Sequence, residues 1–388
     1  MGPIASIFSV RDTEYRDLRA KAVAPLFGPA QVRSGGPKGV IGSCAAEFVD
    51  QLSDFRKAHV KTDLLDLCAR LSIDLITGYL LGQRYGGLSE NRHLALEERQ
   101  SGDAKLSANP WAHAVVSWAW FSLLPNHIFR LVYPIYQRLN SSEQVTESFA
   151  KIDRFAKQIM SSAAGAKVPK PYYYHERLLQ AGVSPLETTA QCQAIIFAGA
   201  DSTAVMLVTT IFLLIQNRSA RIRLLCEIQV QPSGKGGMPF LRAVVKEGLR
   251  LGMASPTRLT RVVPKGQGLR VGDFLLPSGT VVGCAAYNLH HDPDVFLDPF
   301  AFRPERWLDD GKNHGLRRPG MERSMMPFGA GSRACIGKNL AVHEIEETVI
   351  AVVGSEVLEG AYTCQGKIEL TEWFNGDIKG HRIDIEWA

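Results

Sequence analysis

A single cysteine lies in a glycine-rich stretch near the end of the chain, directly before a segment with helical character. The stretch reads Phe-Gly-Ala-Gly-Ser-Arg-Ala-Cys-Ile-Gly over residues 328–337, and the expected helix covers 338–353. Backbone N–H groups and the positive end of a helix stabilise a thiolate and lower its pKa. We therefore expect Cys335 to be a thiolate that binds a metal, on a loop whose turns Gly329 and Gly331 permit.

Two further residues of this loop suit a large flat cofactor. Gly337 leaves room for such a ring at the start of the helix, and Arg333 is able to pair with an acidic group on it. A buried cysteine beside a glycine turn is the structural alternative. A dinucleotide-binding loop fits less well, because no clear strand precedes Gly329.

A second set of polar residues interrupts a long apolar segment. We expect one helix over 186–216, started by the capping pattern of residues 184–187. Its middle holds small residues, one carboxylate and two hydroxyls: Ala198, Gly199, Ala200, Asp201, Ser202 and Thr203. Small residues allow close approach to a flat ring, and a buried acid is costly without partners or a purpose. The segment is compatible with proton delivery to a bound oxygen molecule, or with a capped, solvent-facing aspartate.

A third set consists of charged residues. Glu247 and Arg250 have the i, i+3 spacing of one helix face, and Arg306 is able to complete a buried triad with them. A surface ion pair is the alternative for the first two. The neighbouring His290 and His291 do not predict a zinc site, because adjacent side chains point apart and no third ligand is near.

The composition bounds the class of protein. The chain has 388 residues, of which 45% are hydrophobic and 21% charged, which favours a globular protein over a disordered or polytopic membrane protein. No linker divides it, so we expect one domain over 1–388. The seven cysteines are widely spaced and form no Cys-x-x-Cys pair, which favours a reducing compartment over a disulfide framework.

Charge and hydropathy restrict the kinds of binding partner that the sequence predicts. The net charge of +5 is scattered along the chain and gives no support for a nucleic-acid partner. Basic residues around the cysteine loop would suit an acidic electron donor: Lys312, Arg317, Arg318, Arg323, Arg333 and Lys338. No long apolar run predicts an N-terminal anchor or signal peptide. The tract 111–124 is too short to span a bilayer and predicts a core helix or a helix on a membrane surface.

The elements that must position these residues are mostly helices. Besides the two described above, we expect helices at 45–59, 62–81, 142–164, 220–229 and 240–251. From residue 258 onward, short apolar runs alternate with Pro and Gly, which is typical of short strands and tight turns. The end of the chain, 368–387, again predicts strand pairs. The fold class is therefore mainly α with a small β region.

The order of these motifs resembles the cytochrome P-450 family: the small-residue segment with its acid, then Glu-x-x-Arg, the strand region, Pro-Glu-Arg-Trp at 304–307 and the cysteine loop. The resemblance implies heme b, with Cys335 as the axial ligand of its iron. Tyr15-x-x-x-Arg19 is similar to the family's Trp-x-x-x-Arg, and Arg258 matches the arginine that enters the first sheet. With Arg333, they are implied to bind the heme propionates. The residues implied to contact the ring itself are Phe328, Gly329, Gly337, Ala198 and Gly199.

The resemblance also implies an activity. It is a monooxygenase that inserts one atom of O2 into a lipophilic small molecule, with electrons from NADPH through NADPH-cytochrome P-450 reductase. Asp201 with Ser202 or Thr203 would relay protons. The implied pocket is lined by Phe197, Met253, Thr257 and Phe374. The motifs look fungal, which suggests a secondary-metabolite intermediate as substrate and the cytoplasmic side of the endoplasmic reticulum, with a membrane surface as a further partner.

Two features depart from the family pattern. Ser202 stands where the family usually has Thr, and the helix with Arg19 begins almost at residue 1. The family normally places an anchor, a helix and sheet strands before that helix, so we expect an N-terminally shortened fold that lacks the anchor and the first strands. Two alternatives to a monooxygenase remain: a reductase-independent isomerase or dehydratase, and a non-catalytic remnant.

Overall fold

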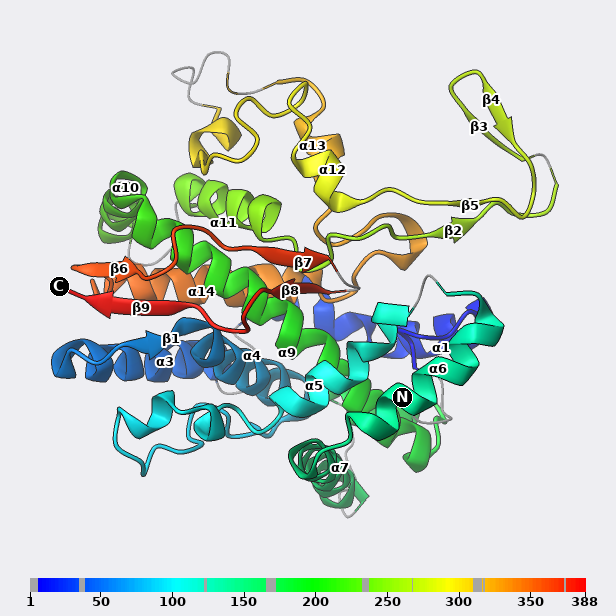
Figure 1. The fold of residues 1–388 in the computed structure, drawn as a ribbon, viewed down its shortest axis with the longest axis horizontal. Helices are drawn as coiled ribbons and strands as arrows, with labels where there is room; N and C mark the ends of the chain where they lie inside the picture. The colour runs from blue at the N-terminus through cyan, green and yellow to red at the C-terminus, as the bar shows by residue number, and fades with distance from the viewer. Residues whose placement is uncertain are drawn as a thin grey trace.

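A long central helix organises the molecule. The computed structural model describes residues 6–34, 39–121, 124–164, 172–231, 237–266, 268–309, 316, 318–372 and 375–388. Within them, α9 (Pro185–Gln216) runs through the middle of the fold, with other helices around it (Figure 1). Its 32 residues span roughly 48 Å at 1.5 Å per residue. Among the described helices, α9 alone is long and apolar enough to cross a membrane, and 67% of its most apolar window is buried.

The helix starts as the capping pattern predicts. Ser184 is the N-cap, its Oγ accepts a hydrogen bond from the N–H of Glu187 at 3.3 Å, and Pro185 is the first helical residue. The described α-helices besides α9 are α1 (Thr13–Val23), α2 (Pro29–Arg33), α3 (Val40–Ala58), α4 (Leu64–Leu81), α5 (Asn109–Val116), α6 (Asn126–Leu139), α7 (Glu143–Ala164), α8 (Tyr174–Gln180), α10 (Arg218–Val230), α11 (Pro239–Gly252), α12 (Ala286–His290), α13 (Met321–Ser324) and α14 (Lys338–Gly354).

Several helical stretches differ from expectation. The segment 62–81 begins as a strand, β1 (Thr62–Asp63), and the helix α4 starts only at Leu64. Asp63 is the N-cap of α4, because its Oδ1 accepts a hydrogen bond from the N–H of Leu65 at 3.1 Å. The tract 111–124 does not form one helix: α5 ends at Val116 and a 3-10 turn follows (Ser117–Phe121). α6 was not predicted, since it carries Pro134 in its interior.

The sheets are small and antiparallel. β9 (Asp384–Trp387) lies between β1 and β6 (Ala361–Thr363). The other pairs are β2 (Arg261–Val262) with β5 (Val281–Val282), β3 (Leu269–Val271) with β4 (Phe274–Leu276), and β7 (Leu370–Glu372) with β8 (Gly376–Ile378). The β3–β4 hairpin projects from the body of the molecule (Figure 1). The predicted fold class, mainly α with a small β region, is confirmed.

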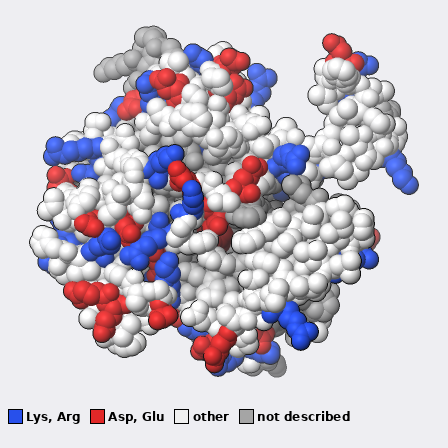
Figure 2. Space-filling model, in the orientation of Figure 1, with Lys and Arg blue, Asp and Glu red and all other residues white. Residues whose placement is uncertain are grey.

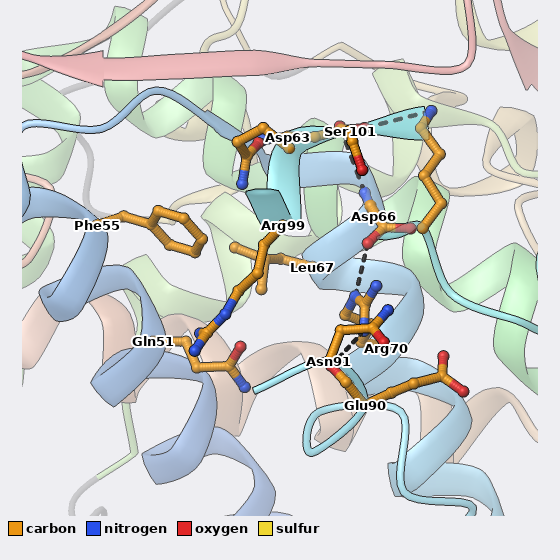
Figure 3. A pocket seen from close by; sticks show the side chains of 12 residues that line it. Gln51, Phe55, Asp63, Asp66, Leu67, Arg70, Glu90, Asn91, Arg99 and Ser101 are labelled. Carbon is orange, nitrogen blue, oxygen red and sulfur yellow. Dashed lines mark hydrogen bonds and ion pairs between the residues drawn. The ribbon is translucent and has the colours of Figure 1, made fainter. Parts of the chain in front are cut away.

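Buried polar contacts hold α5 against the start of α4. Asp66 accepts the N–H of Leu106 at 2.9 Å and the side-chain amide of Asn109 at 3.2 Å. Arg70 pairs with Asp66 at 2.6 Å and donates to the carbonyl oxygen of Ala104 at 2.6 Å. Figure 3 shows Asp66 and Arg70 facing each other beside a cavity of about 20 Å³, which is close to the size of one water molecule. These contacts fix the residues that lead into α5.

The middle of α9 packs closely on α4. A Cβ on Gly199 would lie 2.5 Å from the Cγ1 of Ile76 and 3.1 Å from its Cβ, which is well inside van der Waals contact. The close approach that Gly199 permits in this structure is therefore to α4, which supports the position of the Asp201 segment.

Gly199→Ala is expected to destabilise the protein by about 1–3 kcal/mol, because the added methyl group overpacks a well-filled contact. Urea unfolding of the heme-loaded protein measures the loss. Gly42→Ala is the matched control, since a Cβ there meets nothing within 4 Å. Adding Ile76→Ala to Gly199→Ala creates space for the new methyl group. The free energy of unfolding should therefore fall by less in the double variant than the sum of its decreases in the two single variants. Strictly additive decreases would contradict this packing role.

A buried carboxyl on α14 gives the fold a pH dependence. Glu344 is 2% exposed, and its Oε1 has no hydrogen-bond partner among the described residues. Burial raises the pKa of Glu344 to about 8 from an ordinary value of 4.5. Since the unfolded chain ionises this group more easily, its contribution to stability falls as pH rises from 4.5 towards 8.

Glu344→Gln removes this ionisation. We expect the substitution to raise the melting temperature of the heme-loaded protein at alkaline pH by roughly 2 °C or more relative to its effect at acidic pH. Melting curves of both proteins across this pH range test the expectation. An equal difference between wild type and variant at every pH would show that Glu344 does not titrate as inferred.

Candidate functional site

The cysteine loop has the backbone shape that its glycines predict. Cys335 lies between a 3-10 turn (Gly331–Arg333) and α14, and its N–H donates to the carbonyl oxygen of Phe328 at 2.8 Å. Gly329 and Gly331 have φ values of 69° and 73°, in the left-handed region that favours glycine. The loop therefore requires both glycines to bring Cys335 to the start of α14.

The sulfur receives one backbone hydrogen bond. The N–H of Gly337 bonds to Cys335 and lowers the pKa of its thiol, but burial of the sulfur acts more strongly, so the pKa of Cys335 is raised. In the protein alone, the pKa of Cys335 is therefore raised, whereas the sequence predicted that it would be lowered. The residue as a whole remains exposed, and a bound metal cation would favour the thiolate. A Cβ on Gly337 would lie 3.8 Å from the sulfur, with no closer contact.

Positively charged groups gather beside the loop. Arg333 donates to the carbonyl oxygen of Val10 at 2.9 Å, and Arg16 donates to that of Ser332 at 2.9 Å. Burial and the charges of Arg16 and Arg261 lower the pKa of Arg333. Asp17 acts against this effect and pairs with Arg16 at 3.0 Å. Two guanidinium groups that act on Arg333 favour an additional anion beside it. This arrangement fits an acidic cofactor next to Cys335.

Arg19 and Arg258 have other surroundings. Arg19 forms an ion pair with Glu187 at the start of α9 and lies 3.4 Å over the ring of Tyr15. Arg258 is exposed, and its backbone bridges to Ala285. Among the described residues, neither side chain is hydrogen-bonded or ion-paired to the cysteine loop. Sequence reasoning missed Arg16 and Arg261, although each stands three residues from a predicted arginine.

The polar segment of α9 has defined partners. Asp201 accepts a hydrogen bond from the side-chain amide of Asn375 at 2.6 Å, and burial raises the pKa of Asp201. Ser202 donates to the carbonyl oxygen of Ala198 at 2.8 Å, as a helical hydroxyl can. Thr203 is buried. The segment thus holds a carboxyl whose pKa is raised, next to a hydroxyl group.

Asp201 lies on the wall of a large open groove. The groove has a volume of about 810 Å³, and α5, α7, α9 and the turn around Asn375 contribute to its lining. The predicted pocket residues lie elsewhere: Phe197 is buried against Trp111, with ring centroids 6.0 Å apart, Met253 is buried and Thr257 half-buried. None of these three lines this groove, and Phe374 lies outside the described residues.

The predicted triad residues lie together in the core. The carboxylate of Glu247 accepts from Arg250 at 2.8 Å and 3.0 Å and from Arg306 at 3.0 Å. All three side chains are fully buried. Trp307 also donates to Glu247, at 2.8 Å. The triad joins α11 to the segment that leads to the cysteine loop.

His290 has a structural role that the sequence did not reveal. Its Nδ1 bonds to the carbonyl oxygen of Arg250 at 3.0 Å, and its Nε2 accepts the N–H of Met326 at 2.9 Å. Burial lowers the pKa of His290 to about 4, so it is neutral. His291 instead bonds to the carbonyl oxygen of Tyr287. In the described part of the chain no group of three or more His, Cys, Asp or Glu residues could hold a metal ion.

The fold is mainly helical and its loop carries an exposed cysteine directly before α14, and the comparisons give the family of the chain. A model of the family described as Cytochrome P450 matches residues 7–354. The chain is 65% identical to the cytochrome P450 monooxygenase mfmF of Annulohypoxylon moriforme, over 100% of this chain and 79% of that protein. It is 37% identical to pisatin demethylase of Fusarium vanettenii, over 44% of this chain and 33% of that protein.

Solved structures agree on the fold. The heme domain of cytochrome P450DA superposes with a TM-score of 0.73 at 15% identity, over 99% of this chain and 80% of that one. The chain belongs to the cytochrome P450 family, and its enzyme class is that of a cytochrome P450 monooxygenase. The family implies heme, a substrate and O2, and the cysteine loop with its arginines fits such a cofactor.

Proposed function

We propose that Cys335 binds the iron of heme b and that the enzyme inserts one atom of O2 into a lipophilic intermediate of secondary metabolism. The observation that carries the proposal is the exposed Cys335 on its glycine loop before α14, with three arginines beside it. The fungal relative mfmF, which is named as a monooxygenase, supports the same activity. When bound, heme supplies the chemistry that activates oxygen.

The protein's own residues have separate tasks in this proposal. Arg333, with Arg16 and Arg261 nearby, balances the acidic groups of the cofactor, while Arg19 and Arg258 remain predictions for the same role. Phe328, Gly329, Gly337, Ala198 and Gly199 stay as predicted contacts of the ring. Asp201 holds a proton and passes it on beside Ser202 or Thr203.

The groove suggests the character of the substrate. Apolar and aromatic side chains cover one part of its lining: Val115, Val116, Trp120, Tyr133, Tyr136, Phe149, Ala204 and Val205. His113, Asp201 and Asn375 add a few polar groups. Such a lining binds a lipophilic molecule and orients it through a small number of hydrogen bonds. The predicted pocket residues Phe197, Met253 and Thr257 do not line this groove, and their contact with substrate stays a prediction.

Partners and location follow the same reasoning. Electrons come from NADPH through a reductase, which would dock near exposed Arg323 and Lys338; Lys312 and Arg317 lie outside the described residues. α6 exposes Leu131, Ile135 and Leu139, and Figure 2 shows few charges on the face around it. Such a helix suits a membrane surface, in line with the cytoplasmic side of the endoplasmic reticulum.

A spectrum and an electron-supply test examine the proposal. The reduced, carbon monoxide-bound absorption spectrum of the purified chain should show a heme-thiolate band, and NADPH oxidation should require the reductase. Product formation without NADPH would favour an isomerase or dehydratase. Absence of the thiolate band would favour a remnant without catalytic function.

Asp201→Asn tests the proton role. We expect the heme-thiolate spectrum to remain, and NADPH-driven turnover to slow by roughly 100-fold, because an amide cannot pass on a proton. Asp50→Asn, at an exposed position of α3, is the control and should leave the rate unchanged. Full activity in Asp201→Asn would contradict the assignment.

A further inference from the structure

Further titratable side chains line the same groove as Asp201. His113 comes from α5, Asp377 from β8, and His381 from the turn after β8, and all line the groove that Asp201 lines. The rings of His113 and His381 lie 4.8 Å apart between centroids, at an angle of 35°. The Nδ1 of His381 lies 3.1 Å from a carboxylate oxygen of Asp377. Two imidazoles and a second carboxylate therefore share the wall of the groove with Asp201.

These side chains are held in place from several directions. Asn375 ties the turn between β7 and β8 to Asp201. The next residue, Gly376, donates its N–H to the carbonyl oxygen of Ala254 at 2.8 Å, after the end of α11. Lys105 donates to the carbonyl oxygen of His381 at 2.9 Å. Together with the anchoring of α5 on α4, these contacts fix the relative positions of the two histidines.

The charges of the group act on one another. Burial lowers the pKa of His113; Asp201 and Asp377 act against this, while His381 and Lys105 reinforce it. The hydrogen bond to Asp377 raises the pKa of His381. Burial raises the pKa of Asp201, and both histidines oppose that effect. His381 thus keeps a proton most readily, and His113 gives one up more easily.

The two imidazole rings lie close enough for their charges to interact. Charging both costs electrostatic repulsion, whereas a single positive charge is balanced by the carboxylates at either side. The ordinary pKa of a histidine side chain is about 6.5, so the side chain gains and loses protons in the neutral pH range. His381 is exposed and Asp201 is half-buried, so the group leads from solvent towards α9.

We propose that His381 and His113, aided by Asp377, are positioning residues that supply protons from the groove to Asp201. One proton leaves the His381 imidazolium and joins the neutral His113 ring. A proton then leaves His113 and joins the Asp201 carboxylate, and water in the groove returns one proton to His381. No electron moves in these steps. This inference rests on the proposed role of Asp201.

The first test reads proton binding rather than turnover. Histidine ring signals of the heme-loaded, ferrous, carbon monoxide-bound protein are followed by NMR against pH. Asp201→Asn should lower the pKa of His113 by roughly 0.5 or more, because it removes the negative charge that favours the imidazolium. An unchanged pKa of His113 would overturn the proposal.

The second test measures the rate at which protons arrive. NADPH oxidation is followed with reductase and oxygen, without added substrate, where NADPH, O2 and one proton give NADP+ and hydrogen peroxide. His113→Gln should slow this reaction about tenfold and increase its solvent isotope effect, while the reduced carbon monoxide spectrum stays unchanged. His93→Gln, at an exposed position outside the groove lining, is the matched control and should change neither quantity.

These outcomes distinguish a failure of the proposed role of Asp201 from a failure of the proposed proton supply by the histidines. If Asp201→Asn leaves the rate unchanged, the proposed role of Asp201 fails. If Asp201→Asn slows the reaction but His113→Gln changes neither rate nor isotope effect, only the histidine supply fails. A slower His113→Gln with an unchanged isotope effect would assign the histidine a merely structural or substrate-binding role, which also overturns the proposal.

Discussion

Cys335→Ala is expected to abolish the heme-thiolate spectrum and to leave little heme bound after purification. In the proposed function this sulfur is the side-chain ligand of the iron, and the bond between a thiolate and a metal contributes much more free energy than the apolar contacts of the ring. The measurement is the reduced, carbon monoxide-bound absorption spectrum, together with the ratio of heme to protein.

The control for this prediction uses another exposed cysteine. Cys226 lies on α10 and is exposed, so Cys226→Ala should keep both the spectrum and the heme content of the wild type. Circular dichroism of both variants checks that the helices are formed. A Cys335→Ala protein with an unchanged heme-thiolate spectrum would refute the assignment of this sulfur as the ligand.

Glu247→Gln is expected to destabilise the heme-loaded protein by about 3–5 kcal/mol, because it leaves two buried guanidinium charges without a counter-charge. Both Arg250 and Arg306 are fully buried, and both donate to this carboxylate. The amide also has one acceptor oxygen fewer for the indole of Trp307. Urea unfolding measures the loss, and a lower heme content should accompany it, since the triad supports the segment before the cysteine loop.

An exposed carboxylate gives the comparison. Glu322 pairs with Lys246, and its side chain is 67% exposed, so Glu322→Gln should change the free energy of unfolding by less than about 1 kcal/mol. Equal losses in Glu247→Gln and Glu322→Gln would show that the triad contributes no more than a surface ion pair.

Local sequence signals identified the features that depend on near neighbours. The Ser184 cap and Pro185 fixed the start of α9 because the cap bonds within one turn. Glu247 and Arg250 face each other because three residues separate them on one helix. The glycines of the cysteine loop were recognised because a left-handed backbone excludes most other residues.

Features that depend on distant segments were not recognised. The carboxylate of Glu187 suited a capping box, yet it binds Arg19 of α1, and no local pattern reveals that competition. The pairing of β9 with β1 places Ile385 opposite Thr62, far away along the chain. The groove of Asp201 is assembled from α5, α7, α9 and the turn at Asn375, so His113 and His381 carried no signal in the sequence. Whether residues 1–388 form one domain stays a prediction.

Iron X-ray absorption on the purified, heme-loaded chain tests most directly whether sulfur from this loop binds the iron. The account predicts one sulfur neighbour of the iron in the wild type and its disappearance in Cys335→Ser. An iron surrounded only by nitrogen and oxygen in the wild type, or a sulfur neighbour that persists in Cys335→Ser, would contradict it.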